Sequence, residues 1–347
     1  MDLFTPVTTE EKLHPIFKLL TKERYGPERD VLKNWSEGFI DRDGKFVHEF
    51  QTTFESSLWE LYLYACLKKF SAEIDFAHHA PDFVTNLENG ICIEATIAAP
   101  AQGGKPPMGK FTKEDLPFDF GDFNAEATIR ICNSISSKLK KYQQSYSNLS
   151  HVKNKPFVIA LASFDRPHSQ FAANRPLMAA VYGLYYDEAA ALAQGASATK
   201  VPSVFVNSAI KENGAEVPIG IFNDDRYSDI SAIIYSPVAT WGKIRALADN
   251  PTEMSMYTTI HPNSDSIFPV VRVTKKSDYV EDLLDGMYVL HNPFAKNPIS
   301  SNTFNHERIA QIIPHLEDDF LEMVAPDDFL LTRFLGSMIP KEGFVDI

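Results

Sequence analysis

The sequence predicts an α/β fold in which a mixed central β-sheet is flanked by helices. Two long segments, 53–70 and 124–146, repeat apolar residues at the spacing of an amphipathic helix. Between them, segment 81–96 carries two apolar runs separated by a turn signal, which is typical of a β-hairpin. Segment 156–164 is a continuous apolar run of the kind found in strands buried on both faces. Helix, hairpin, helix and buried strand in this order place a sheet between helical layers.

The chain divides into three regions that we expect to form one composite domain, because no internal repeat and no clean linker separates them. Residues 1–50 indicate an N-terminal helical extension, and residues 51–165 contain the predicted core. Residues 166–347 are expected to extend the same sheet with further strands and helices. Within this last region, 304–324 suggests one or two helices.

Composition limits the classes of function. The formal net charge of −13 argues against a broad basic face for nucleic acid, so any such face must be local. The best local candidate is segment 130–155, although a solvated helix face explains its lysines equally well. No run of 18 apolar residues and no basic-then-apolar start is present, so we expect neither a membrane span nor a secretory signal. Buried free thiols in a reducing cytoplasm are the expected state of the three cysteines, Cys66, Cys92 and Cys132.

Two acidic residues lie at the ends of the predicted hairpin strands, Asp82 after Pro81 and Glu94 after an Ile-Cys-Ile run. A carboxylate in such a place needs a partner, and a divalent cation is one. Because side chains alternate along a strand, Asp82 shares the face of Glu94 only if an odd number of residues forms the hairpin loop. We predict a three-residue loop over 88–90, which would place Asp82 opposite Thr96.

With these residues in place, the chain resembles the PD-(D/E)XK nuclease superfamily. Pro81-Asp82 matches the PD, Glu94 matches the second acid, and the order of elements from 53 to 164 is similar to the restriction-endonuclease-like core. The resemblance implies a Mg²⁺ ion, replaceable by Mn²⁺, bound by Asp82, Glu94 and the Ala95 carbonyl. Thr96 stands where the family has its lysine. In some members this lysine has moved to a neighbouring element, and Lys138 on the following helix is the candidate here.

Each of the additional candidates also has a structural explanation. Glu55 could be a further metal ligand on the first helix, or it could close a capping box with Thr52. Lys138 could act in catalysis, or it could lay its stem along the core edge and reach solvent, whereas Lys140 and Lys141 are expected to point away. The pair His78-His79 could bind phosphate or lie in a solvated loop.

Three functions remain open at this stage. The first is a Mg²⁺-dependent endonuclease, a hydrolase acting on nucleic acid and on DNA before RNA, in restriction, defence or repair. The second is an inactive protein of the same fold that binds nucleic acid or a protein partner. The third is a two-carboxylate hydrolase such as a glycosidase. The resemblance implies a homodimer as one expectation, because many nucleases of this shape act as dimers. The acidic balance suggests either that the protein avoids indiscriminate binding of nucleic acid or that another subunit targets it.

Overall fold

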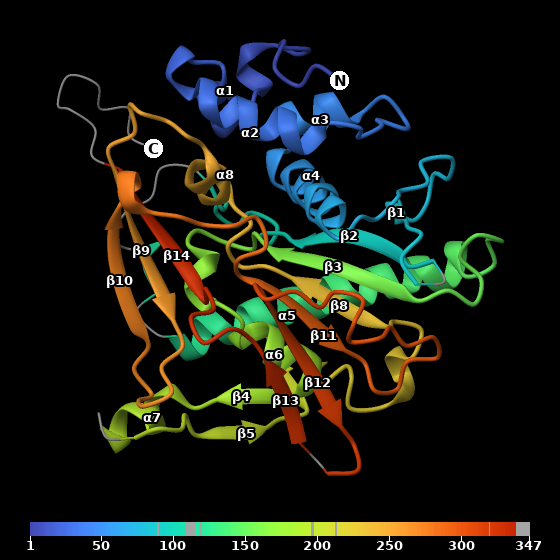
Figure 1. Ribbon diagram of the computed structural model, residues 1–347. Helices are drawn as coiled ribbons and strands as arrows, with labels where there is room; N and C mark the ends of the chain where they lie inside the picture. The colour runs from blue at the N-terminus through green and yellow to red at the C-terminus, as the bar shows by residue number, and fades with distance from the viewer. Residues whose placement is uncertain are drawn as a thin grey trace.

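The protein is built around one seven-stranded mixed sheet that lies between two helical layers (Figure 1). This computed structural model describes residues 1–88, 90–108, 115–117, 120–195, 198–211, 214–318 and 320–337. The predicted fold class, a mixed sheet flanked by helices, is confirmed. In the described part of the chain, no helix is both long enough and apolar enough to cross a membrane.

The strands of the main sheet follow the order β1-β2-β3-β8-β11-β12-β13. Neighbouring strands β2, β3 and β8 run parallel, β1 pairs antiparallel with β2, and β11 pairs antiparallel with β8. Strand β12 runs parallel to β11, and β13 closes the far edge antiparallel to β12. The bounds are β1 (Phe83–Val84), β2 (Cys92–Ala98), β3 (Phe157–Ser163), β8 (Ala232–Tyr235), β11 (Met287–His291), β12 (Ile309–His315) and β13 (Phe320–Val324).

The N-terminal helices cover one face of this sheet, and α5 with α6 cover the other (Figure 1). Alternate side chains of the strands enter the two cores, so that Ile93 and Val158 face α4 whereas Cys92 and Ile159 face α5. The buried Trp59 joins α4 to β3 by donating a hydrogen bond to the Ala160 carbonyl over 3.0 Å. The helices are α1 (Pro15–Leu20), α2 (Gly26–Ser36), α3 (Phe46–Thr52), α4 (Phe54–Lys69), α5 (Phe120–Lys141), α6 (Arg175–Tyr182), α7 (Glu188–Gln194) and α8 (Trp241–Leu247).

Shorter elements complete the chain. A π-helical turn (Tyr142–Tyr146) follows α5 directly, and 3-10 turns are formed by Glu10–Lys12, Glu23–Tyr25, Ser169–Ala172, Asp225–Tyr227 and Lys276–Asp278. A second sheet has the order β10-β9-β14, and two small sheets pair β4 with β5 and β6 with β7. Their bounds are β4 (Leu184–Tyr186), β5 (Ser203–Phe205), β6 (Ser208–Ile210), β7 (Glu216–Pro218), β9 (Ser255–His261), β10 (Val270–Lys275) and β14 (Thr332–Ser337).

The second half of the chain shows where the prediction was right and where it was wrong. Strands β8 and β11 extend the main sheet as expected, and β12 and β13 join it as well. Strands β9, β10 and β14 form a second sheet and β4 to β7 form two small ones, so the region does not extend one sheet throughout. The helices expected over 304–324 are absent, because this segment forms β12 and β13. The apolar run of β12 is buried continuously from Ile309 to Ile312, and a short run of this kind does not distinguish a buried strand from a buried helix. The three cysteines are buried and unpaired, as predicted.

Candidate acidic site at the edge of the sheet

The hairpin places Asp82 and Glu94 on the same face. Phe83 pairs with Ile93 and Val84 with Cys92, so the same register puts Asp82, the residue before β1, opposite Glu94. The loop was predicted too short. The amide of Thr85 still donates to the Ile91 carbonyl over 2.9 Å, and residues 86–90 make the connection. The loop therefore has the predicted odd parity but a different register, and its position 89 lies outside the described residues.

Asp82 is held at the point where the hairpin ladder ends. Its Oδ2 accepts a hydrogen bond from the Ala95 amide over 2.7 Å, and its Oδ1 lies 3.9 Å from Arg42 Nη2. Arg42 also donates to the carbonyls of His78 and Pro81, over 2.5 and 3.2 Å, and so fixes the segment that carries Asp82. Burial and the nearby charge of Glu94 raise the pKa of Asp82 to about 6, although Arg42 and other donors oppose the shift.

Glu94 is the most buried member of the site, with 1% of its side chain exposed. Its Oε1 accepts hydrogen bonds from Lys138 Nζ over 2.8 Å and from Lys141 Nζ over 3.1 Å. The Tyr146 hydroxyl lies 3.4 Å from the same oxygen. Its Oε2 is buried and has no hydrogen-bond partner among the described residues. A buried carboxylate oxygen without a donor is costly, and a bound cation would remove that cost.

The structure brings Lys138 to Glu94, the place where the sequence predicted a displaced lysine. Lys141 was expected to point away, and this was wrong. Lys138 and Lys141 are three positions apart on α5, so they lie on the same side of the helix, and the long stem of Lys141 reaches the shared carboxylate. Thr96 lies on the same face as Glu94 and is half-buried, but a hydroxyl carries no positive charge.

The acid that α4 contributes is Glu60 rather than Glu55. Glu55 forms an ion pair with His14 Nε2 at 3.2 Å, away from the hairpin. The capping box with Thr52 is absent as well, because Thr53 is the N-cap and the Thr52 hydroxyl donates to the His48 carbonyl. Helix α4 begins one residue later than the capping box requires, and Glu55 therefore lies in its first turn facing α1.

Sequence reasoning missed Glu60, although it is the one acid in the interior of an otherwise apolar helix. Burial and the charge of Asp82 raise the pKa of Glu60 to about 8, and Glu94 adds to the shift. Glu60 and Asp82 thus interact electrostatically in a partly buried region, and each makes ionisation of the other less favourable. The Ala95 amide points towards Asp82, and the carbonyl of a strand residue points to the same side as its amide, which places the Ala95 oxygen at this edge too.

Two histidines frame the segment before Asp82. The rings of His78 and His151 stack with centroids 3.6 Å apart, and His151 Nε2 lies 2.7 Å from the Ala80 carbonyl. His78 Nε2 also lies 3.3 Å from Asp75 Oδ2. These contacts give the predicted His78 a structural role, holding the approach to Asp82.

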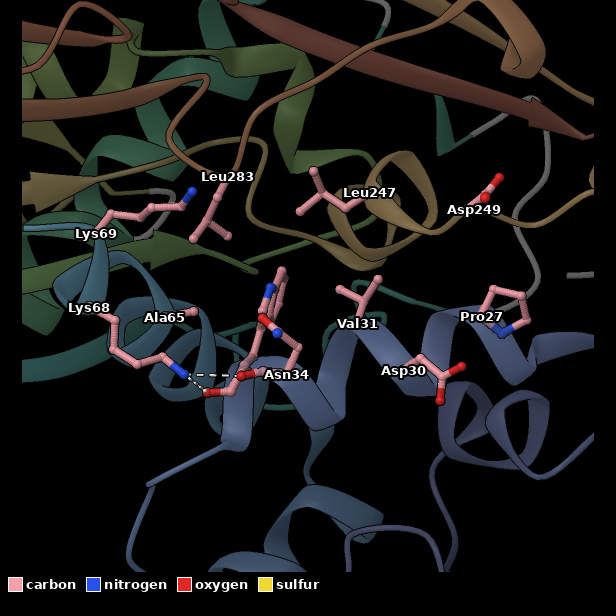
Figure 2. A pocket seen from close by; sticks show the side chains of 11 residues that line it. Pro27, Asp30, Val31, Asn34, Ala65, Lys68, Lys69, Leu247, Asp249 and Leu283 are labelled. Carbon is pink, nitrogen blue, oxygen red and sulfur yellow. Dashed lines mark hydrogen bonds between the residues drawn. The ribbon is translucent and has the colours of Figure 1, made fainter.

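The site lies at the edge of the sheet and combines a buried Glu94 with a more exposed Asp82. Among the described residues, no three His, Cys, Asp or Glu side chains are grouped so that they could hold a metal ion, so the two hairpin acids are the cation candidates here. A cavity of about 620 Å³ lies between α2, α4 and α8 (Figure 2). Val31, Leu247 and Leu283 line it, and Lys68 reaches the α2 carbonyls of Asn34 and Trp35. Its charged lining residues include Asp30, Lys69 and Asp249, but no buried side-chain oxygen or nitrogen without a hydrogen-bond partner is found among its described lining residues, in contrast to Glu94 at the hairpin edge.

Comparisons of the chain with protein-family models, with curated proteins and with solved structures found no match.

Proposed function

We propose that this protein is a Mg²⁺-dependent nuclease that hydrolyses phosphodiester bonds of nucleic acid, with DNA as the first substrate to test. One observation carries the proposal: the buried Glu94 has an oxygen without a donor beside the second carboxylate, Asp82. The other Glu94 oxygen already holds the ammonium of Lys138. Carboxylates that can hold a divalent cation are suited to metal-assisted phosphoryl chemistry, and a neighbouring ammonium can stabilise negative charge.

The residues at this edge suit a hard cation. Asp82 and Glu94 supply carboxylate oxygens, and the Ala95 carbonyl could add a third oxygen ligand, with water filling the remaining positions. When bound, Mg²⁺ or Mn²⁺ would lower the pKa of a water molecule and offset charge on the phosphoryl oxygens. The raised pKa values of Asp82 and Glu60 support the assignment, since both reflect burial and, after it, repulsion by a neighbouring carboxylate, and a cation would offset both.

The side chains around Glu94 would then serve hydrolysis directly. Lys138 is held 2.8 Å from Glu94, where its ammonium can orient a water molecule against the phosphorus atom. As the bond from the water oxygen to phosphorus forms, the bond to the leaving sugar oxygen breaks. The proton of the water passes to a carboxylate of the site, and the leaving oxygen takes a proton from solvent. The order α4, β1, β2, α5, β3 supports a restriction-endonuclease-like core as part of the same proposal.

A second candidate is an inactive protein of the same fold that binds nucleic acid or a protein partner. Thr96 favours it, because the strand itself lacks a lysine beside the acids. Both candidates predict binding, whereas only the nuclease predicts turnover.

The deciding experiment incubates the protein with plasmid, linear duplex, single-stranded DNA and RNA, each with Mg²⁺, Mn²⁺ or EDTA. We expect cleavage that EDTA abolishes and that Asp82→Asn and Glu94→Gln each reduce by at least about a hundredfold. Asp224→Asn is the matched control, since Asp224 is exposed and pairs only with Arg226 in a surface turn. Cleavage that survives EDTA or Asp82→Asn contradicts the proposal. Metal-independent binding without turnover favours the inactive protein.

A further inference from the structure

Two lysine ammonium groups share a single oxygen of Glu94. Lys138 Nζ and Lys141 Nζ lie 2.8 and 3.1 Å from Oε1. The two side chains differ in exposure: 22% of Lys138 is exposed and 51% of Lys141. Lys138 is therefore the inner partner of Glu94, and Lys141 faces solvent with one side of its ammonium group.

The backbone after Lys141 adds a second, independent feature. Helix α5 ends at Lys141, and the chain continues as the π-helical turn. Turns of this kind are rare overall, and those that occur often lie at functional sites. This turn brings the ring of Tyr146 beneath the Lys141 ammonium, with 5.0 Å between Nζ and the ring centroid. Tyr146 is buried, and its hydroxyl also reaches Glu94 at 3.4 Å. Lys141 thus rests on an aromatic platform that can hold its cation whether or not Glu94 remains its partner.

The sharing of one carboxylate oxygen by two ammonium groups would change when a cation occupies the site. A cation on Glu94 Oε2 would weaken the attraction between that carboxylate and the two ammonium groups. The more exposed one, the ammonium of Lys141, would then be released. The nearest incoming anion in a nuclease is the phosphate backbone of its substrate. A lysine ammonium acts on phosphate as a point charge with three donors.

We propose that Lys141 is the phosphate-binding residue of this site. It leaves Glu94 for a non-bridging oxygen of the substrate phosphodiester, while Lys138 stays on Glu94 and Tyr146 holds Lys141 in place. The inference rests on the proposed nuclease function and adds a division of labour between the two lysines. In this proposal Lys141 contacts the phosphate backbone of the nucleic acid and not its bases, so its contribution to binding does not depend on base sequence.

The test compares Lys141→Ala with Lys140→Ala. Lys140 is the adjacent residue, is exposed and has no contact with Glu94, so both variants lose the same charge from the same helix. Binding of a labelled duplex is followed by fluorescence anisotropy in EDTA and in Ca²⁺ at several salt concentrations. For Lys141→Ala we expect Kd to rise about tenfold and the slope of log Kd against log salt to fall by about one. For Lys140→Ala we expect much smaller changes in both.

Steady-state cleavage in Mg²⁺ separates the roles of the two lysines. Lys141→Ala should raise KM more than it lowers kcat, Lys138→Ala should mainly lower kcat, and Lys141→Arg should restore most of the affinity. Thermal unfolding confirms that each variant is folded, and Lys141→Arg serves if Lys141→Ala is not. If wild-type protein cleaves DNA while Lys141→Ala and Lys140→Ala are equal in affinity and salt slope, the role of Lys141 is refuted and the nuclease function stands. If no variant cleaves but Lys141→Ala alone weakens binding, phosphate binding by Lys141 stands and the nuclease function fails.

Discussion

Replacing Glu60 by Gln should remove much of the pH dependence of unfolding in the metal-free protein. The ordinary pKa of this carboxyl is 4.5, and burial together with Asp82 raises it to about 8 in the folded state. Between these two values, the folded protein keeps a proton that the unfolded chain has released. The unfolded state therefore binds fewer protons, and the free energy of unfolding falls as the pH rises through this window.

The magnitude follows from the size of the shift. At about 1.36 kcal/mol per pKa unit, a rise from 4.5 to about 8 sets a ceiling of roughly 5 kcal/mol. Glu60 is only half-buried and titrates together with Asp82. Solvent screening and the interaction with Asp82 therefore reduce the contribution of Glu60 to the change in the free energy of unfolding. We expect wild type to lose about 2 kcal/mol more than Glu60→Gln between the lower and the upper end of the window.

The assay is urea unfolding in EDTA at pH values spaced across this window. Glu55→Gln is the control. It makes the same substitution on the same helix, but the pKa of Glu55 is lowered, whereas the pKa of Glu60 is raised. Burial opposes ionisation of Glu55, but its ion pair with His14 lowers the pKa, so Glu55 is ionised across the window. Glu55→Gln should therefore keep the fall in the free energy of unfolding that Glu60 causes across the window. Parallel pH profiles for wild type and Glu60→Gln would refute the reasoning about clustered carboxyl groups.

Three further predictions follow from the same contacts. The affinity for Mn²⁺ should rise with pH, because Asp82 and Glu60, with pKa values of about 6 and about 8, must lose protons to bind it; calorimetry in buffers of different ionisation heat should detect proton release, and a pH-independent affinity would contradict this. Lys138→Ala should lower kcat by about a hundredfold in the cleavage assay, while unchanged turnover would return Lys138 to a purely structural role. Glu281→Gln should lower the free energy of unfolding by about 3 kcal/mol or more, because Lys243 and Arg333 are buried against this carboxylate. A loss below about 1 kcal/mol in urea unfolding would show that these two ion pairs contribute little to stability.

Local patterns were sufficient where the chain itself sets the geometry. The apolar spacing of α4 and α5 predicted both helices, and the continuous run of β3 predicted a strand buried on both faces. The parity of the hairpin linked Asp82 to Glu94, since alternation along a strand follows from covalent geometry. The place of Lys138 at the rim of the apolar stripe of α5 followed from the helical repeat in the same way.

Contacts between segments distant in the sequence could not be predicted from local patterns. Glu60 joins the site because α4 crosses the sheet beside β1, and Arg42 joins it because the chain before α3 turns back to the Pro81 carbonyl. Lys141 and Tyr146 meet at Glu94 only because a π-helical turn shifts the backbone after α5.

By itself, the sequence determined which residues lie on the same face of each helix and strand, and hence the two acids and the inner lysine. The tertiary structure alone decided which helix covers which face of the sheet, and so which additional acid, arginine and lysine reach those two. The physical reason is that residue periodicity is a property of one element, whereas the crossing of elements depends on how all apolar faces are buried together.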